Sequence, residues 1–423
     1  MIGRSFSPAE TLTEGHLPNA PTDTDPTDAA LRRWRADTPG CSERNHLNNA
    51  GAALMPASVL SAIVEHLELE SRIGGYEAAD VRDTQAAETY RRLGALLNTS
   101  PANIAIVPSA TAGFVRAVSS FDFAPGDVIV TSRCDYTSNQ IQYLALSKRL
   151  GVEILYANDL PEGGVDPDSV RELALHPRCR LVSVSWIPTN SGLIQDVAAV
   201  GDVCERIGVP FLIDACQAVG QIEIDVTRLK CDYLSATARK FLRGPRGIGF
   251  MYASDRALAR GDHPLFVDMR GARWSDLHSY EIQKSAKRYE EWELPYALVL
   301  GMSEAARYAL DVGVDVASAR AFALAAELRR ELSRIPGVRI LDEGSRVCAI
   351  VTAVIEGLDA SEVVKALAAR RINAVATLRE YAIMDFDQKQ VTSAVRLSPH
   401  YYNTSDEIGS AVDCIREIAA RTN

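Results

Sequence analysis

Between residues 103 and 252 the sequence alternates short apolar runs with longer segments of helical periodicity, and this alternation limits the possible folds most strongly. Runs that are apolar at nearly every position are typical of parallel strands buried on both faces, with helices as the connections. The runs are Ile104–Val107, Asp127–Thr131, Glu153–Tyr156, Leu181–Ser185, Phe211–Asp214, Tyr233–Ser235 and Gly249–Tyr252. The pattern predicts an α/β domain with a mostly parallel, seven-stranded sheet.

The pattern changes after Leu294–Pro295, where long helical stretches precede a few short strand candidates, of which Ala394–Leu397 is the last. We expect a smaller α+β domain there. The predicted divisions are a loosely ordered tail at 1–28, a segment at 29–60 that packs on the small domain and the site, a large domain at 61–295 and a small domain at 296–423.

Charge and cysteine content exclude several classes of function. The chain has 45 Lys and Arg against 55 Asp and Glu, a net charge of −10, and it lacks a polybasic segment, so we expect no nucleic-acid or membrane partner. Its eight cysteines form no CxxC pair and no cluster at metal-ligand spacing, which predicts free thiols and no metal site. Without a signal peptide or an apolar run of about 18 residues, the protein is expected to be soluble and cytoplasmic.

Two segments that follow predicted strands carry groups suited to carbonyl chemistry. Lys240, in SATARKFLRGPRGIG, follows a buried strand, where desolvation lowers an amine pKa and favours Schiff-base formation. A surface lysine in a basic loop is the alternative. Asp214, in FLIDACQAVG, ends another strand, and a protonated pyridine nitrogen would satisfy its buried charge. Helix capping is the alternative for this carboxylate.

Two further segments carry groups suited to anions. In IVPSATAG, Ser109 to Thr111 lie between a strand and a helix, where free N–H groups can hold a phosphate, although an ordinary helix cap explains the same pattern. In AVRLSPHYYNT, Arg396 lies on a short strand and is suited to a carboxylate, or else to a structural ion pair. Together, the four segments indicate a pyridoxal-phosphate (PLP) enzyme with a small amino-acid substrate.

From about His46 to Arg421 the chain resembles the class V aminotransferase and cysteine-desulfurase-like superfamily, PLP fold type I. The resemblance rests on Asp214 and Gln217 in DxxQ, on RKFLRGPRGIG around Lys240 and on VRLSPHYYNT around Arg396. It implies a homodimer with the active site near the subunit interface.

The resemblance also implies roles for individual residues. Lys240 would bind the cofactor covalently and move the proton at the substrate Cα. Asp214 would pair with the ring nitrogen, and Gln217 with the phenolic oxygen. The other implied cofactor contacts are Ala110, Thr111, Tyr136 (ring stacking), Thr189, Thr237 and Arg239. The implied substrate contacts are Arg396 (the α-carboxylate), Asn49, Ala50, Gly51, Asn190 and Trp292.

Two departures from the family pattern narrow the expected reaction. Desulfurases carry a nucleophilic Cys on a mobile loop shortly before the strand of the carboxylate-binding Arg, but residues 373–392 contain none, and Cys348 lies too early, in an apolar strand. Secondly, the family's RxExGTxN loop reads RYEEWELP here, with Trp292 and Glu293 in place of Gly-Thr. That change puts one contact with the partner subunit's phosphate in doubt.

With Trp292 and Glu293 in this loop, the chain resembles an actinobacterial branch of the family. That branch contains C–S lyases of ergothioneine synthesis, isopenicillin-epimerase-like enzymes and lincosamide enzymes acting on S-conjugated cysteine. We therefore expect β-elimination from an S-substituted L-cysteine in secondary metabolism, such as antibiotic biosynthesis. Decarboxylation-coupled oxidative deamination of the same substrate to an S-linked aldehyde is the first alternative, and transamination or epimerisation the second. A Rossmann dehydrogenase would need GxGxxG directly after the first strand, which is missing. A non-enzymatic protein would not need Lys240, Asp214 and Arg396 together.

Overall fold

The structure is a computed structural model that describes residues 28–421, so the predicted tail lies outside the described residues except for Asp28. A seven-stranded sheet forms the centre of the large domain, in the order β2-β8-β7-β6-β5-β3-β4. Only β8 runs antiparallel to its neighbours, which confirms the predicted mostly parallel α/β sheet. The strands are β2 (Ile104–Val107), β3 (Val128–Ser132), β4 (Glu153–Ala157), β5 (Cys179–Ser185), β6 (Phe211–Asp214), β7 (Tyr233–Thr237) and β8 (Gly249–Ala253).

Helices cover both faces of this sheet, and buried residues at every position of β2, β3, β6, β7 and β8 explain the apolar runs. Polar caps mark the helix starts, as where Asp196 accepts from Ala199 N at the start of α8. The helices between the strands are α5 (Ala110–Val118), α6 (Thr137–Leu150), α7 (Pro167–Ala174), α8 (Val197–Ile207) and α9 (Val226–Leu229), while η2 (Pro101–Asn103) precedes β2 and α10 (Asp255–Ala259) follows β8.

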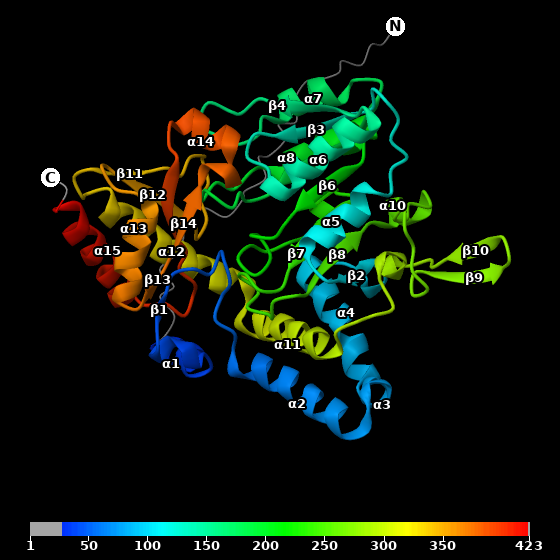
Figure 1. Ribbon diagram of the computed structural model, residues 1–423, viewed down its shortest axis with the longest axis horizontal. Coiled ribbons are helices and arrows are strands. Elements are labelled where there is room, and N and C mark those ends of the chain that lie inside the picture. Colours follow the sequence, from blue (N-terminus) through cyan, green and yellow to red (C-terminus); the bar gives the residue numbers. More distant parts are fainter. Residues whose placement is uncertain (1–27, 422–423) are drawn as a thin grey trace, which may run out of the picture.

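Three helices precede the sheet, in a region for which the sequence analysis predicted none. They are α2 (Ala57–Ile73), α3 (Gly75–Val81) and α4 (Asp83–Leu97). Helix α11 (Tyr296–Val312) packs on both α2 and α4 (Figure 1). Large side chains such as Leu60 and Leu67 stay exposed on α2, so its apolar residues do not mark a single buried face.

The small domain contains a four-stranded antiparallel sheet in the order β11-β12-β15-β14. This confirms a smaller C-terminal α+β unit. Its elements are α12 (Val314–Leu332), β11 (Val338–Ile340), β12 (Val351–Ile355), α13 (Ala360–Ala369), β13 (Ile372–Asn373), β14 (Val375–Leu378), η4 (Arg379–Tyr381), α14 (Ile383–Lys389), β15 (Ser393–Leu397) and α15 (Ser405–Ala419). Cys348 is buried but precedes β12, so its predicted place in a strand was wrong.

The first described residues lie against the small domain, and from there the chain continues to the large one. After α1 (Asp28–Ala36) and η1 (Pro39–Ser42), β1 (Asn45–His46) pairs in parallel with β13, and Asn48 bridges to Ser398. The backbone N–H of Ala53 then donates to the carbonyl of Arg239, 2.9 Å away. Residues 45–53 therefore connect the small domain to the loop that carries Lys240.

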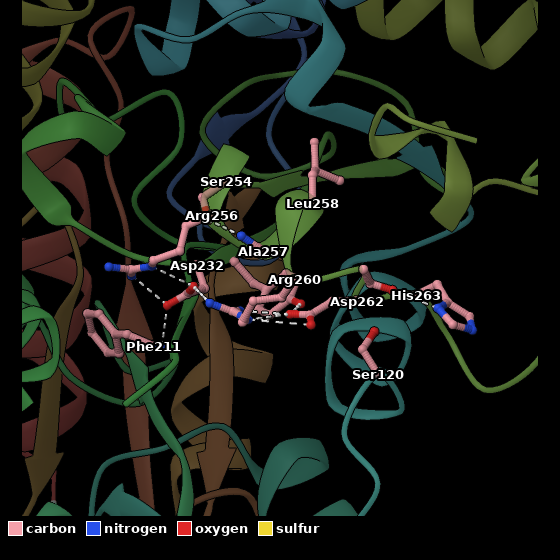
Figure 2. A network of polar contacts seen from close by, with 12 residues as sticks. Ser120, Phe211, Asp232, Ser254, Arg256, Ala257, Leu258, Arg260, Asp262 and His263 are labelled. Atoms are coloured by element: carbon pink, nitrogen blue, oxygen red, sulfur yellow. Dashed lines mark hydrogen bonds and ion pairs between the residues drawn. The ribbon is translucent and has the colours of Figure 1, made fainter. Parts of the chain in front are cut away.

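The two edges of the large sheet differ in their chemistry. At the amino ends of β6 and β7, Asp232 is fully buried and accepts from Phe211 N, and Arg256 and Arg260 converge on the same carboxylate (Figure 2). Both carboxylate oxygens of Asp232 therefore have hydrogen-bond partners, and these contacts fix α10 against the sheet. The opposite edge, at the carboxyl ends of the parallel strands, contains polar groups without partners, where ligands of such sheets bind.

One hairpin extends away from the rest of the large domain. It consists of β9 (Ala272–Asp276) and β10 (Ser279–Ile282), and η3 (Ala286–Tyr289) follows it (Figure 1). Trp274 on this hairpin is 77% exposed, and Phe266 just before it is 87% exposed. Among residues 28–421, no helix combines the length and the apolar character needed to cross a bilayer.

Candidate active site

A cavity of about 110 Å³ lies at the carboxyl ends of the parallel strands. All nine residues predicted to contact the cofactor line it: Ala110, Thr111, Tyr136, Thr189, Asp214, Gln217, Thr237, Arg239 and Lys240. These residues come from five separate segments of the large domain, between residues 110 and 240. The fold therefore brings the predicted set together around one space.

Lys240 lies in the loop after β7 and lines this cavity. The residue is only 7% exposed, and within residues 28–421 its ammonium group has neither a hydrogen-bond partner nor an ion pair. Burial lowers the pKa of Lys240 below its ordinary value, more than the nearby charges change it. A buried amine with a lowered pKa and no partner is suited to react with a carbonyl group.

Asp214 and Gln217 face the same cavity from the segment after β6. The Oδ1 atom of Asp214 accepts from Cys216 N at 2.9 Å, and its Oδ2 atom accepts from Asn139 Nδ2 at 3.2 Å. Neither donor is a cation. The Nε2 atom of Gln217 donates to the carbonyl of Ala50 at 3.2 Å, while its Oε1 atom is buried without a partner. Both side chains therefore have capacity for a ligand.

The start of helix α5 forms another wall of the cavity. Ser109 caps the helix, accepting from Ala112 N at 3.1 Å, and the first N–H groups of such a helix have no partner within it. Gly249 packs beneath this turn, because a Cβ atom there would lie 2.4 Å from the carbonyl oxygen of Ala236 and 3.1 Å from Ala110 N. Together with Thr237 and the guanidinium of Arg239, this helix start can hold a phosphate.

Arg396 is a buried cation that no carboxylate neutralises among the described residues. Its Nη1 atom donates to the carbonyl oxygen of Thr189 at 2.6 Å and to the Thr189 hydroxyl at 3.0 Å, and Nη2 donates to Asn48 Oδ1 at 3.5 Å. The Nε atom is buried without a partner. Burial, and secondly the charge of Arg239, lowers the pKa of Arg396 to about 10. A carboxylate ligand would relieve this unpaired charge.

The remaining predicted substrate residues occupy different places. Asn49 is fully buried and donates to the carbonyl oxygens of His46 and Ser398, so its side chain is part of the scaffold. Gly51 accepts from Arg239 through its carbonyl. Trp292 is 48% exposed and does not line the cavity. Its contribution to the site stays a prediction, as do the roles assigned to the other residues.

Asn190 connects the cavity wall to helix α14 of the small domain. Its Nδ2 atom donates to Asp385 Oδ2 at 2.6 Å, and Lys389 Nζ lies 2.9 Å from the same oxygen. Arg133, which follows β3, donates to the other oxygen of Asp385 and pairs with Asp159 at 2.5 Å. The Asp385 side chain is 1% exposed. These contacts fasten the segment between β14 and β15 to two loops of the large domain.

PLP fits the donors and charges of this cavity. A helix start and Arg239 suit its phosphate, the Lys240 amine suits its aldehyde, Asp214 suits a protonated ring nitrogen, and the unpaired Gln217 oxygen lies buried in the same wall. The family comparison agrees, because the model described as Aminotransferase class-V matches residues 45–410. The chain belongs to the class V aminotransferase family. It is a PLP-dependent enzyme of that family.

Two relatives found by sequence are named probable cysteine desulfurases. A probable cysteine desulfurase of Methanothermobacter thermautotrophicus is 25% identical over 391 residues, which cover 91% of this chain and 97% of that protein. A probable cysteine desulfurase of Pyrococcus abyssi is 24% identical over 91% of this chain and 96% of its own length.

Solved structures share the fold of nearly the whole chain. The apo cysteine desulfurase of Thermococcus onnurineus superposes with a TM-score of 0.84 at 20% identity and covers 92% of this chain and 98% of its own. The cystine C–S lyase C-DES, solved with its reaction product cysteine persulfide, superposes with a TM-score of 0.81 at 22% identity, covering 90% of this chain and 99% of its own. At these identities the likeness shows PLP fold type I.

Sequence analysis missed several residues of the site. Asn48, Ser185 and Cys216 contact Arg396 or line the cavity, and Asp135 and Asn139 lie directly behind Asp214. In the segment DYTSN at 135–139, only Tyr136 was predicted to belong to the site. Asn139 was missed because its contact with Asp214 joins residues that are far apart in the sequence. A polar side chain in the first turn of the helix that follows a strand is the signal available, and it is also an ordinary feature of a helix start.

Proposed function

We propose that this enzyme is a C–S lyase that cleaves an S-substituted L-cysteine by β-elimination and releases a thiol, pyruvate and ammonia. The observation that carries the proposal is a buried free amine in the cavity together with the buried guanidinium of Arg396, which no carboxylate neutralises among the described residues and which contacts Thr189 of the cavity wall. Arg396 suits the α-carboxylate of an amino acid, and the Lys240 amine suits the base that would take the Cα proton. We place the reaction in secondary metabolism, in the branch with ergothioneine and lincosamide enzymes that the RYEEWELP loop resembles.

The proposed reaction uses few protein groups. Bound PLP supplies an electron sink, which acidifies the Cα proton of an attached amino acid. Arg396 holds the carboxylate, Lys240 accepts the Cα proton, and the Cβ–S bond breaks with its electron pair leaving on sulfur as a thiolate. The released three-carbon enamine takes up water, giving pyruvate and ammonium, and the thiolate takes up a proton. No external oxidant is required.

Cysteine desulfuration is the second candidate, favoured by the names of the relatives. A desulfurase needs a cysteine thiol that reaches the substrate sulfur. Residues 373–392 contain no cysteine, and Asp385 fastens this segment to the large domain. Cys216 lines the cavity, but burial raises the pKa of its thiol, which disfavours the nucleophilic thiolate. These observations favour the lyase.

Product analysis distinguishes the candidates. Full-length enzyme is incubated with L-cysteine and with S-alkyl-L-cysteines of increasing size, and pyruvate, thiol, alanine and aldehyde are quantified. We expect equal amounts of pyruvate and thiol, and no product from Lys240→Ala. Alanine from L-cysteine would support the desulfurase, an S-linked aldehyde the oxidative deamination, and a keto acid that retains sulfur or a racemised substrate the remaining alternatives.

We also propose that the enzyme works as a homodimer with the active site near the subunit interface. Exposed large apolar side chains lie close together in the sequence around the β9–β10 hairpin, and such surfaces are typical of protein interfaces. They are Leu265, Phe266, Met269, Trp274, Leu277, Tyr280 and Trp292. The family resemblance supports a second copy of this chain as the partner.

A further inference from the structure

A second buried carboxylate lies behind Asp214, in the turn between β3 and α6. Asp135 is 6% exposed and accepts five hydrogen bonds. Its Oδ1 atom accepts from Tyr136 N at 2.7 Å, Asn139 Nδ2 at 3.0 Å and Ser185 Oγ at 2.6 Å. Its Oδ2 atom accepts from Thr131 Oγ1 at 2.9 Å and from the Tyr143 hydroxyl at 2.8 Å. Neither the sequence motifs nor the family comparison assigns this group a role.

Asn139 connects this carboxylate to Asp214. The residue lies in the first turn of α6 and is 2% exposed. Its single side-chain nitrogen donates to Asp135 Oδ1 at 3.0 Å and to Asp214 Oδ2 at 3.2 Å. An amide nitrogen carries two protons, so each carboxylate receives one of them. The two acidic groups are thus held one amide group apart.

The hydrogen-bond donors of this pair of carboxylates are all uncharged, although the Lys240 amine lines the same cavity as Asp214. Every donor to Asp135 and Asp214 is a hydroxyl, an amide side chain or a backbone N–H, and no Lys, Arg or His forms an ion pair with either group within residues 28–421. Burial raises the pKa of Asp135, and its hydrogen bonds oppose that rise. Two adjacent buried anions are unfavourable unless a positive charge is added beside them.

We propose that Asp135 is a positioning residue that acts through Asn139, and that the two carboxylates together form the counter-charge for the protonated ring nitrogen of PLP. Asp214 lines the cavity, whereas Asp135 adds negative charge from behind and orients the amide that holds Asp214. The arrangement concerns cofactor binding alone. It therefore holds whichever reaction the enzyme catalyses.

The test compares two cofactors on full-length enzyme that has been freed of PLP and reloaded. One is PLP, and the other is an analogue with C–H in place of the ring nitrogen, which cannot carry the positive charge. We expect Asp135→Asn to weaken PLP binding about tenfold, which corresponds to roughly 1.4 kcal/mol. The same substitution should change binding of the analogue less than about twofold, because no charge faces the carboxylates.

Controls separate this role from a structural one. Asp127→Asn removes a buried carboxylate at the amino end of the same strand, where it accepts from Ala124 N and Arg178, and it should leave the ratio of the two affinities unchanged. Asp214→Asn should change the ratio more than Asp135→Asn does, and no change there would refute the assignment of Asp214 itself. Equal weakening of both cofactors by Asp135→Asn, or no weakening, would overturn the proposal.

A second variant keeps the proposal testable if Asp135→Asn does not fold. Asn139→Ala removes the amide between the two carboxylates and leaves both of them in place. We expect a loss of at least about threefold for PLP and no comparable loss for the analogue, since this amide is the group that contacts both carboxylates and holds them side by side. An unchanged ratio of affinities in folded Asn139→Ala would contradict the role given to Asn139.

Discussion

At the scale of single residues, two buried cations define the site. Lys240 and Arg396 both lack a carboxylate partner among the described residues, and for both the pKa falls because of burial. Charged groups without partners are unfavourable in a folded protein, and they persist where a ligand uses them. Burying these charges without a partner should therefore lower the free energy of unfolding of the cofactor-free protein.

Lys240→Met should stabilise the cofactor-free protein at neutral pH, raising Tm by at least about 2 °C. In the wild type, a lowered folded-state pKa means that the unfolded chain binds the Lys240 proton more tightly. The destabilisation is therefore complete below the folded pKa and disappears as the pH rises from there toward the unfolded value of about 10.4.

Calorimetry from pH 7 to 10 checks this, with the exposed Lys148→Met as the control. The Tm difference between Lys240→Met and wild type should shrink with rising pH. A difference that is absent at pH 7, or that grows with pH, would contradict the account of Lys240.

Arg396→Lys should raise KM for an amino-acid substrate about 10- to 100-fold, with a smaller change in kcat. Lysine keeps the charge but loses the planar fork that pairs with a carboxylate and with Thr189. Steady-state kinetics measures the changes in KM and kcat separately. Arg379→Lys, at an exposed ion pair with Asp387, is the matched control. A loss confined to kcat would indicate that Arg396 does not bind the substrate carboxylate.

Sequence motifs predicted the groups that face the cavity but not the groups that hold them. Lys240 and Asp214 follow apolar runs, so their position at strand ends could be predicted from the local pattern. Asn48 and Asp135 act through contacts that depend on the tertiary fold, and a single sequence contains no periodicity that marks them. The open alternatives for Lys240 and Arg396, a surface lysine and a structural ion pair, are excluded by burial and by the absence of a partner in residues 28–421.

At the scale of elements, the segment between β14 and β15 differs from a mobile loop. Its helix α14 carries Asp385, whose contacts with Arg133 and Asn190 join the two domains beside the cavity. Alternation of apolar runs with helices predicted the strands of the large sheet to within two residues, since β2, β3, β6, β7 and β8 are buried at every position. Helices α2 to α4 were not predicted, although the buried residues Tyr90, Leu93 and Leu97 of α4 recur at helical spacing.

Asp385→Ala should release α14 and destabilise the protein by about 3–5 kcal/mol, because it leaves Arg133 and Lys389 buried without their shared anion. Hydrogen exchange should become faster in residues 379–389 before it does in the large sheet. Asp387→Ala is the control on the same helix, since its ion pair with Arg379 is exposed and contributes at most about 1 kcal/mol. Equal exchange in both variants would show that Asp385 does not fasten this segment.

At the scale of the whole molecule, we expect the exposed apolar side chains around the hairpin to be buried against a second copy of this chain. We expect the protein to sediment at twice the 46.0 kDa mass of one chain. Phe266→Ser together with Trp274→Ser should weaken the dimer at least about tenfold, by removing two large apolar contacts. Ile141→Ser with Leu144→Ser, on the exposed face of α6, is the control. A monomeric wild-type enzyme with full activity would contradict the proposed assembly.

The fate of the substrate's carboxyl carbon tests the central claim most directly. An S-alkyl-L-cysteine labelled with ¹³C at the carboxyl carbon is turned over by the full-length enzyme, and the products are followed by NMR. The proposed β-elimination keeps this carbon, so the label should appear in the carboxylate of pyruvate in an amount equal to the thiol released. Label in bicarbonate, or in an acid that still carries sulfur, would contradict the assignment of this enzyme as a C–S lyase.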